Sequence, residues 1–164
     1  MDFYESQKRE SQAVSPTPRA QAGPSARVIH FEPDTPPDLH HTRIVSAQFD
    51  GLSASNWNDL VHQAHRRAVA RGLSFEALRS ATQSNIASGL RKDSGFRYVP
   101  DINLSIQNVD ANLAWRNALN LARRLKVPIH VEFEWRDADG AAHPGKKALV
   151  SWVPVGSDKR TGHA

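Results

Sequence analysis

Residues 110–136 decide the fold; they read DANLAWRNALNLARRLKVPIHVEFEWR. Asp110 is a typical N-cap residue, and apolar side chains then recur at steps of four and three, as one face of an amphipathic helix requires. Pro128 ends that helix, because proline lacks a backbone N–H and keeps the residue before it extended. From residue 129 to 136 apolar and polar residues alternate, which predicts a half-buried strand. The rest of the chain is interpreted outward from this helix and strand.

Three further strands are predicted from alternation, at residues 43–49, 96–107 and 147–155. Pro100 interrupts the second of them, which favours a bulge or an edge position there. The last strand and the one before it form an antiparallel hairpin with a long loop. The inward set on the first strand is Val45, Ala47 and Phe49.

Two more helices are predicted between the first two strands. Ser55 caps the first, which runs for about four turns to Gly72, and Ser74 caps the second, which ends before Gly89. The order is β-α-α-β-α-β-β. Strands joined by helices are usually parallel neighbours. We therefore expect an α+β domain: a two-layer sandwich with a mixed four-stranded sheet, helices on one face, and a polar face that stays open or is covered by the tail or a partner.

Proline marks the ends of the folded part. Six of the ten prolines precede residue 43, in a segment rich in Ser, Gln and Ala that buries too little apolar surface to offset its conformational entropy. We expect a disordered tail at 1–42, one domain at 43–156, and a frayed end at 157–164. One piece of the tail, residues 27–31, has strand-like content and is a candidate edge strand.

Composition excludes several classes of protein. The 164-residue chain has no cysteine, so it has neither disulfides nor a thiolate metal site. Mean hydropathy is −0.55 and no long apolar run is present, so we expect no membrane span. The first residues lack the basic and apolar parts of a secretory signal. A cytoplasmic protein is the default expectation.

Positive charge is concentrated in the helical part of the chain. Residues 1–42 carry four basic and six acidic residues, whereas 60–126 carry 11 basic and four acidic residues, net +7. On the 111–125 helix, one polar stripe lies opposite the apolar stripe, and its residues step by four, four and three: Asn112, Arg116, Asn120 and Arg123. A basic helical face that binds nucleic acid is one hypothesis. Its candidate residues are Arg66, Arg67, Arg71, Arg91, Lys92, Arg116, Asn120, Arg123, Arg124 and Lys126, with Asn112 on the same stripe.

The alternative for these residues is an ordinary solvated face, because arginine favours helices and basic residues complement the C-terminal end of a helix dipole. No helix-turn-helix, zinc-finger or aromatic single-strand platform is present. Glu132 and Glu134 on the exposed sheet face repel phosphate. If nucleic acid binds, we expect it on the helical layer.

The hairpin loop at 137–146 is the most distinctive local feature. It resembles neither an EF-hand loop, which ends in a bidentate Glu, nor a phosphate-binding loop, since Lys147 replaces the Ser/Thr and a strand follows. We interpret it as structural, with a candidate partner-binding role. The residues concerned are Asp137, Asp139, His143 and Lys146. His62 and His65 share a helix face, but two histidines do not make a metal site, and we expect no metal or cofactor.

Three functional hypotheses remain. The first is a non-catalytic interaction module that binds a protein partner through the open sheet face or the tail. The second is nucleic-acid binding through the basic helical face. The third is a small hydrolase or transferase that uses the 137–146 loop with Glu132 and Glu134. No motif supports catalysis, so we favour the first.

Overall fold

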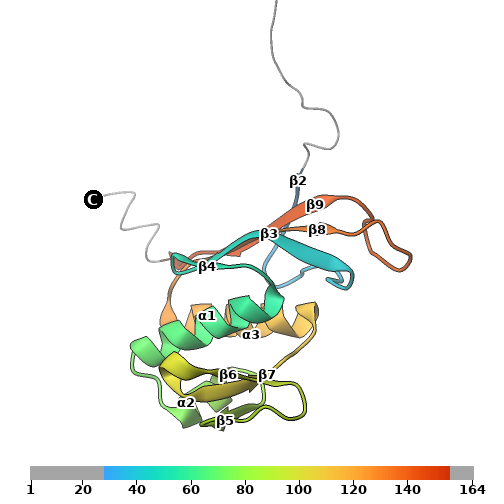
Figure 1. The fold of residues 1–164 in the computed structure, drawn as a ribbon. Coiled ribbons are helices and arrows are strands. Elements are labelled where there is room, and N and C mark those ends of the chain that lie inside the picture. The colour runs from blue at the N-terminus through green and yellow to red at the C-terminus, as the bar shows by residue number, and fades with distance from the viewer. Residues whose placement is uncertain (1–27, 156–164) are drawn as a thin grey trace, which may run out of the picture.

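The computed structural model describes residues 28–155, and within them the chain forms three α-helices and two β-sheets (Figure 1). The helices are α1 (Trp57–Ala70), α2 (Phe75–Ala81) and α3 (Ala111–Leu125). The strands of the large sheet are β2 (Val28–Phe31), β3 (Thr42–Phe49), β4 (Leu52–Ala54), β8 (Ile129–Trp135) and β9 (Lys147–Trp152). The strands of the small sheet are β5 (Ile86–Ser88), β6 (Phe96–Val99) and β7 (Leu104–Gln107).

The large sheet is mixed, in the order β2-β9-β8-β3-β4. Only β2 runs parallel to its neighbour, with Phe31 opposite Val150; the other pairs are antiparallel. The candidate edge strand in the predicted tail is thus a strand of the domain. The predicted inward set of β3 is wrong at one position. The register shifts between Ile44 and Ser46, so Val45 is the extra residue of a β-bulge and is 47% exposed, while Ile44 packs against the core in its place.

The small sheet is the main departure from the predicted fold. The expected strand at 96–107 divides at Pro100, which begins a short 3₁₀ turn (Pro100–Ile102) that Asn103 closes with a left-handed φ of 52°. The chain reverses there, so β6 and β7 pair as an antiparallel hairpin. A strand that folds back on itself pairs locally, and these residues do not join the large sheet. The expectation of one four-stranded sheet is therefore wrong.

The second predicted helix also ends early. It stops at Ala81, and Ile86 lies instead in β5, which pairs antiparallel with β7. Gln83, Ser84 and Asn85 have weak helix propensity, and all three are bound outside the helix: Gln83 and Ser84 to Asn117, and Asn85 to Gln107. The caps of the longer helices differ less from expectation: Asn56 rather than Ser55 caps α1, and Asp110 caps α3.

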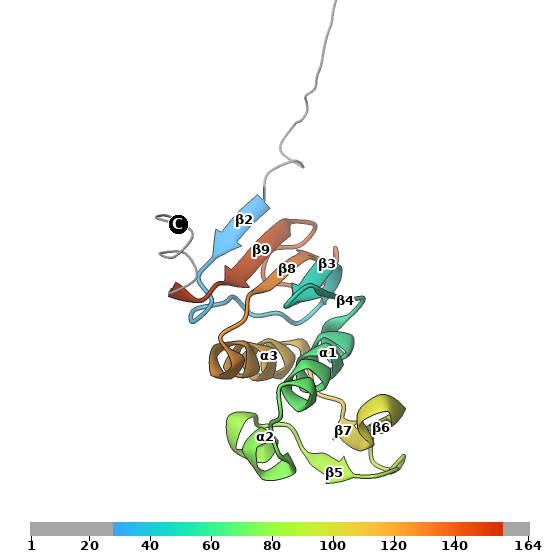
Figure 2. The ribbon, with the colours of Figure 1, turned by 90° about the vertical axis from the view of Figure 1, so that its left-hand side faces the viewer.

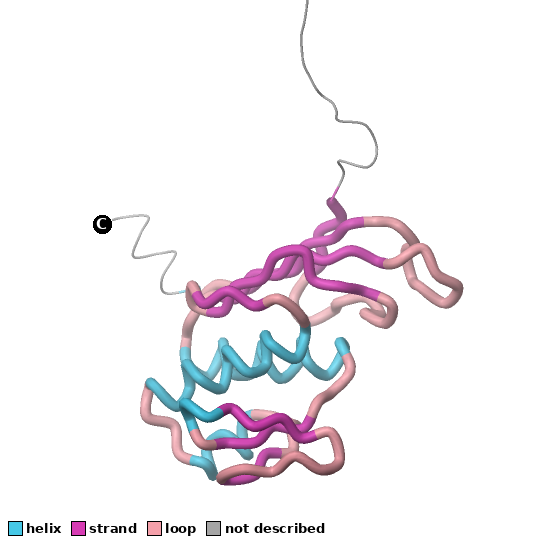
Figure 3. The backbone as a smooth tube through the Cα atoms, in the orientation of Figure 1, coloured by secondary structure: helices cyan, strands magenta, loops and turns pink. Residues whose placement is uncertain are grey.

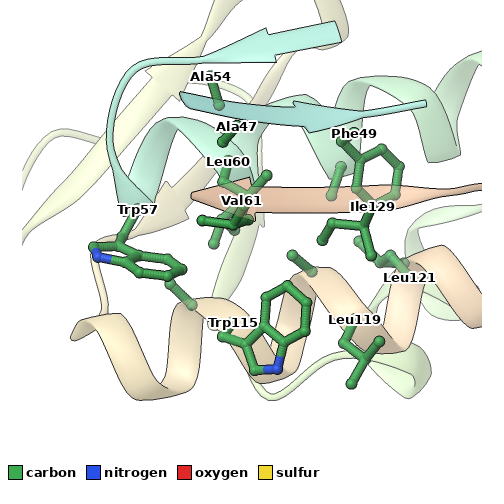
Figure 4. Packing of buried hydrophobic residues seen from close by; sticks show 14 of the residues in the cluster. Ala47, Phe49, Ala54, Trp57, Leu60, Val61, Trp115, Leu119, Leu121 and Ile129 are labelled. Carbon is green, nitrogen blue, oxygen red and sulfur yellow. The ribbon is translucent and has the colours of Figure 1, made fainter. Parts of the chain in front are cut away.

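The helices α1 and α3 lie between the two sheets, so the domain has three layers rather than two. Figures 1 and 2 show the large sheet on one side of α1 and α3, and the small sheet with α2 on the other; Figure 3 shows the same order by secondary structure. The core fills the space between the large sheet and the helices α1 and α3 and continues to Val99, Leu104 and Ile106 of the small sheet. Figure 4 shows part of it. Its members there include Phe49, Leu60, Val61, Trp115 and Ile129.

The middle position of α3 explains why more than one apolar stripe of this helix is buried. Leu119, Leu121 and Asn117 are buried beside the predicted inward residues Trp115 and Ala118. Asn117 accepts a hydrogen bond from the backbone N–H of Gln83 and donates to the Ser84 hydroxyl. A buried amide needs such partners. The side-chain amide of Asn117 therefore anchors α3 to the chain that follows α2.

The segment after β2 belongs to the folded part, although it lies within the predicted tail of residues 1–42. Leu39 is fully buried. The remainder of that tail, residues 1–27, and the predicted frayed end at 157–164 lie outside the described residues. Among residues 28–155, no helix combines the length and apolar character needed to cross a membrane.

Candidate functional site: a groove beside α3

A surface groove of about 620 Å³ lies between α3 and residues Pro33–Asp38. We call residues 33–38 the strap. Figure 2 shows the chain after β2 passing below β9 and β8, on the side of the sheet that faces α3. The helix contributes Asn112, Trp115, Arg116, Leu119, Asn120 and Arg123 to the groove, and all six residues of the strap line it.

The strap is tied to the domain at both ends. At its start, the Trp115 indole N–H donates to the carbonyl of Pro33 over 3.0 Å, and the Arg123 guanidinium donates to the Asp34 carboxylate over 2.8 Å. At its end, the Asn112 amide donates to the Asp38 carboxylate over 3.0 Å, and its oxygen accepts the backbone N–H of Leu39 over 2.8 Å. The Pro-rich strap thus has a fixed course along the helix.

The charges at the two ends of the groove are already partnered. The hydrogen bond from Arg123 lowers the pKa of Asp34 below its ordinary value, and the amide of Asn112 lowers that of Asp38. Both carboxylates are therefore ionised at neutral pH. The side chains of Arg116 and Asn120, between these ends, have no hydrogen-bond or ion-pair partner within residues 28–155.

Three of the predicted nucleic-acid residues, Arg116, Asn120 and Arg123, are brought together in this groove. Most of the other candidate residues are paired with carboxylates elsewhere in the domain, away from the groove. Arg66 meets Asp101 at 2.9 Å, and Arg91 meets Asp93 at 2.9 Å, with its guanidinium 4.2 Å from the Phe96 ring centre.

At the end of α1, one carboxylate serves two further candidates. Arg67 and Arg71 lie 3.0 and 3.3 Å from Asp50. Lys92 lines a shallow hollow beside β6, while Arg124 is exposed on α3 and Lys126 closes that helix with a left-handed φ of 59°. The basic residues are thus distributed over several elements, and those on α1 and the 89–95 loop are largely neutralised.

The 137–146 loop is held by packing and backbone turns. The His143 ring lies 4.8 Å from that of Trp135 in an edge contact and 6.1 Å from that of Phe31. Asp137 lines a small hollow of about 340 Å³ with Arg43 and Glu134, while Asp139 and Lys146 are exposed. Within the described residues, no side-chain hydrogen bond or ion pair joins any two of these four candidate residues.

The candidate acid–base and metal-binding side chains, Glu134, His62 and His65, are bound to other groups or lie apart from one another. Glu134 is bound by Arg43 at 2.6 Å and stands opposite Lys147. His65 is buried and its Nδ1–H donates to the Val61 carbonyl over 2.8 Å, while His62 lines a separate polar hollow. Among residues 28–155, no group of three metal-ligating side chains is found.

Sequence reasoning missed the strap, because its prolines were interpreted as a linker. One signal was present: the strand-like residues 27–31 end one residue before it, and a strand that joins the sheet fixes the chain that follows. In comparisons with known proteins, no family model, curated protein or solved structure matches this chain.

Proposed function

We propose that this protein is a non-catalytic protein-binding module that holds an extended segment of a partner in the groove between α3 and the strap. The observation that carries the proposal is that the side chains of Arg116 and Asn120 line this groove without a described partner, between two ends at which α3 binds an aspartate of the strap. Hydrogen-bond donors placed in a cleft with apolar walls are typical of a binding site.

The lining suits a peptide. The strap supplies the apolar surface through the half-buried Pro33, Pro36 and Pro37, while Trp115 and Leu119 lie buried beneath the floor of the groove. A volume of about 620 Å³ is in the range of small-ligand sites and matches a few residues of extended chain. Apolar walls with a few polar groups give a peptide both contact area and orientation.

The open face of the large sheet is the weaker candidate for the same partner. Its charged residues compensate one another, since Glu134 lies between Arg43 and Lys147. A solvated polar face on an antiparallel sheet needs no cover. Among the described strands of this sheet, Val45 at the bulge is the one large apolar residue that is classed as exposed.

Nucleic-acid binding is the second candidate, favoured by the presence of Arg116, Asn120 and Arg123 in one groove. Asp34 and Asp38 stand at the two ends of that groove and repel a chain of phosphates. Binding of a nucleic acid through its backbone weakens steeply with salt, which gives a direct test.

The experiment uses the full chain and a library of random eight-residue peptides displayed on phage. Selected peptides are measured against Asn120→Trp, which fills the groove, and Arg124→Trp, which changes an exposed residue of the same helix outside it. We expect peptides that Asn120→Trp releases and Arg124→Trp retains.

Two results would overturn the proposal. The first is a selection whose peptides all bind Asn120→Trp as well as the unchanged protein. The second is a single-stranded oligonucleotide that binds at low salt, is released at high salt, and is lost in Arg116→Gln, which would assign the groove to nucleic acid.

A further inference from the structure

We infer that the segment held in the groove carries one acidic side chain, bound by Arg116 and Asn120, with neutral or basic residues on either side of it. This inference rests on the proposed function and names the chemistry of its ligand.

The first argument is the match between the strap and the polar stripe of α3. Asn112 and Arg123 are eleven residues apart, which is about 16 Å along a helix. They bind Asp38 and Asp34, four residues apart, which is up to about 14 Å of extended chain. The strap therefore runs antiparallel to α3 and places one carboxylate at each end of the stripe.

The second argument is what the strap lacks in between. Opposite Arg116 and Asn120 it has only Thr35, Pro36 and Pro37, none of which carries a charge. Of the four residues of the polar stripe, the strap therefore supplies acidic partners only for Asn112 and Arg123, at its two ends. A third carboxylate, brought by another chain, would complement Arg116 and Asn120 between them.

The third argument is the donor and acceptor inventory of the walls. Guanidinium groups only donate, an amide NH₂ donates twice, and proline residues have no N–H. The indole N–H of Trp115 is used by Pro33. The unengaged side-chain donors are the Arg116 guanidinium and the Asn120 NH₂ on α3 and the Thr35 hydroxyl on the strap. The guanidinium carries the positive charge, so together they favour an oxyanion over a cation.

The fourth argument limits the ligand to one negative charge. Asp34 already pairs with Arg123, and Asp38 is bound by the neutral amide of Asn112. Among the described residues of the lining, Arg116 is therefore the one arginine without a carboxylate partner. A second acid next to the first would approach one of these aspartates and be repelled. A run of carboxylates or phosphates is therefore a poorer ligand than an isolated acid.

The test uses two display libraries of eight-residue peptides on the full chain, one with Glu and one with Gln fixed at the fifth position. We expect groove-dependent peptides, defined by their release in Asn120→Trp, to come mainly from the Glu library. Replacing that Glu by Gln in a selected peptide should weaken binding roughly tenfold, as for a charge-assisted hydrogen bond. A peptide of eight glutamates should bind less well than the selected ones.

Matched variants locate the acid. Arg116→Gln should remove the preference for Glu over Gln, Arg116→Glu should favour Lys at that position, and Arg124→Gln should leave the preference unchanged. Groove-dependent peptides drawn equally from both libraries would overturn this inference and leave the proposed function standing. Absence of groove-dependent peptides from both libraries would overturn the two together.

Discussion

The indole N–H of Trp115, in the first half of α3, donates to the carbonyl of Pro33 at the start of the strap over 3.0 Å. The ring itself is 1% exposed, so this bond joins a core residue to the chain that walls the groove. We predict that Trp115→Phe lowers the free energy of unfolding by about 2–3 kcal/mol, from lost volume and an unpaired carbonyl. Chemical denaturation measures it.

The control for that variant is Trp57→Phe, which removes a similar indole bond, to the Thr42 hydroxyl over 3.0 Å. We expect comparable destabilisation from both. Hydrogen exchange of the strap's backbone should quicken only in Trp115→Phe. Equal exchange in the two variants would mean that Trp115 does not fix the strap.

His65 makes stability depend on pH. Burial lowers its pKa from 6.5 to about 4, because the folded protein disfavours the charged ring. The unfolded chain therefore binds more protons between these values, and stability falls as pH drops from about 6.5 to 4, by about 2–3 kcal/mol. Burial lowers the pKa of His62 as well, in the same direction. Denaturation at a series of pH values should show the loss.

The matched variant is His65→Leu, which removes the titrating group at similar volume. We expect its stability to vary less over the same pH interval. Aspartates whose pKa is lowered, such as Asp34, act at more acidic pH, since their ordinary value is 3.8. An unchanged slope in His65→Leu would show that other groups cause the dependence.

The turn between β3 and β4 requires glycine at its second position. Asp50 and Gly51 connect Phe49 to Leu52 and have φ of 49° and 83°, as in a type I′ hairpin. We predict that Gly51→Ala lowers the free energy of unfolding by about 1 kcal/mol, because a Cβ is strained in this region. No atom obstructs the added carbon, so strain alone acts. Gly51→Asn should cost less, since Asn tolerates positive φ.

The bulge in β3 predicts opposite outcomes for two adjacent residues. Val45→Ser should change stability by less than about 0.5 kcal/mol, since Val45 faces solvent. Ile44→Ser should cost about 1–2 kcal/mol, because Ile44 packs on the core. The denaturant midpoints of the two variants test this difference in stability. A larger loss of stability in Val45→Ser than in Ile44→Ser would contradict the bulge.

Several parts of this fold could be predicted from periodicity. The helix α3 and the strand β8 lie within one residue of their expected bounds, because steps of three and four and strict alternation both continue over several turns or pairs. The same alternation wrongly placed Val45 toward the core. One extra residue in β3 moves the residues before it to the opposite face of the sheet from the one that alternation predicts. A bulge is set by pairing with β8, which local sequence does not encode.

Other parts depend on contacts between distant residues. The division of 96–107 into two strands turns on Pro100, whose position suggested a bulge, whereas Asn103 in a left-handed conformation completes a reversal. The strap could not be predicted because prolines at 33, 36 and 37 are typical of linkers, and its anchor residues lie over seventy positions away on α3. Of the candidate site, the stripe on α3 was predicted and its acidic partners were not.

The pairing of β2 with β9 gives the chain a definite order of assembly during synthesis. β2 is the first described strand to leave the ribosome, and its partner is the last. A nascent chain that has emerged as far as α3 has the helix and the strap but no sheet edge for β2 to join. The groove therefore acquires its final wall only after almost the whole domain has been translated, and we expect ribosome-bound chains stalled before β9 to lack it.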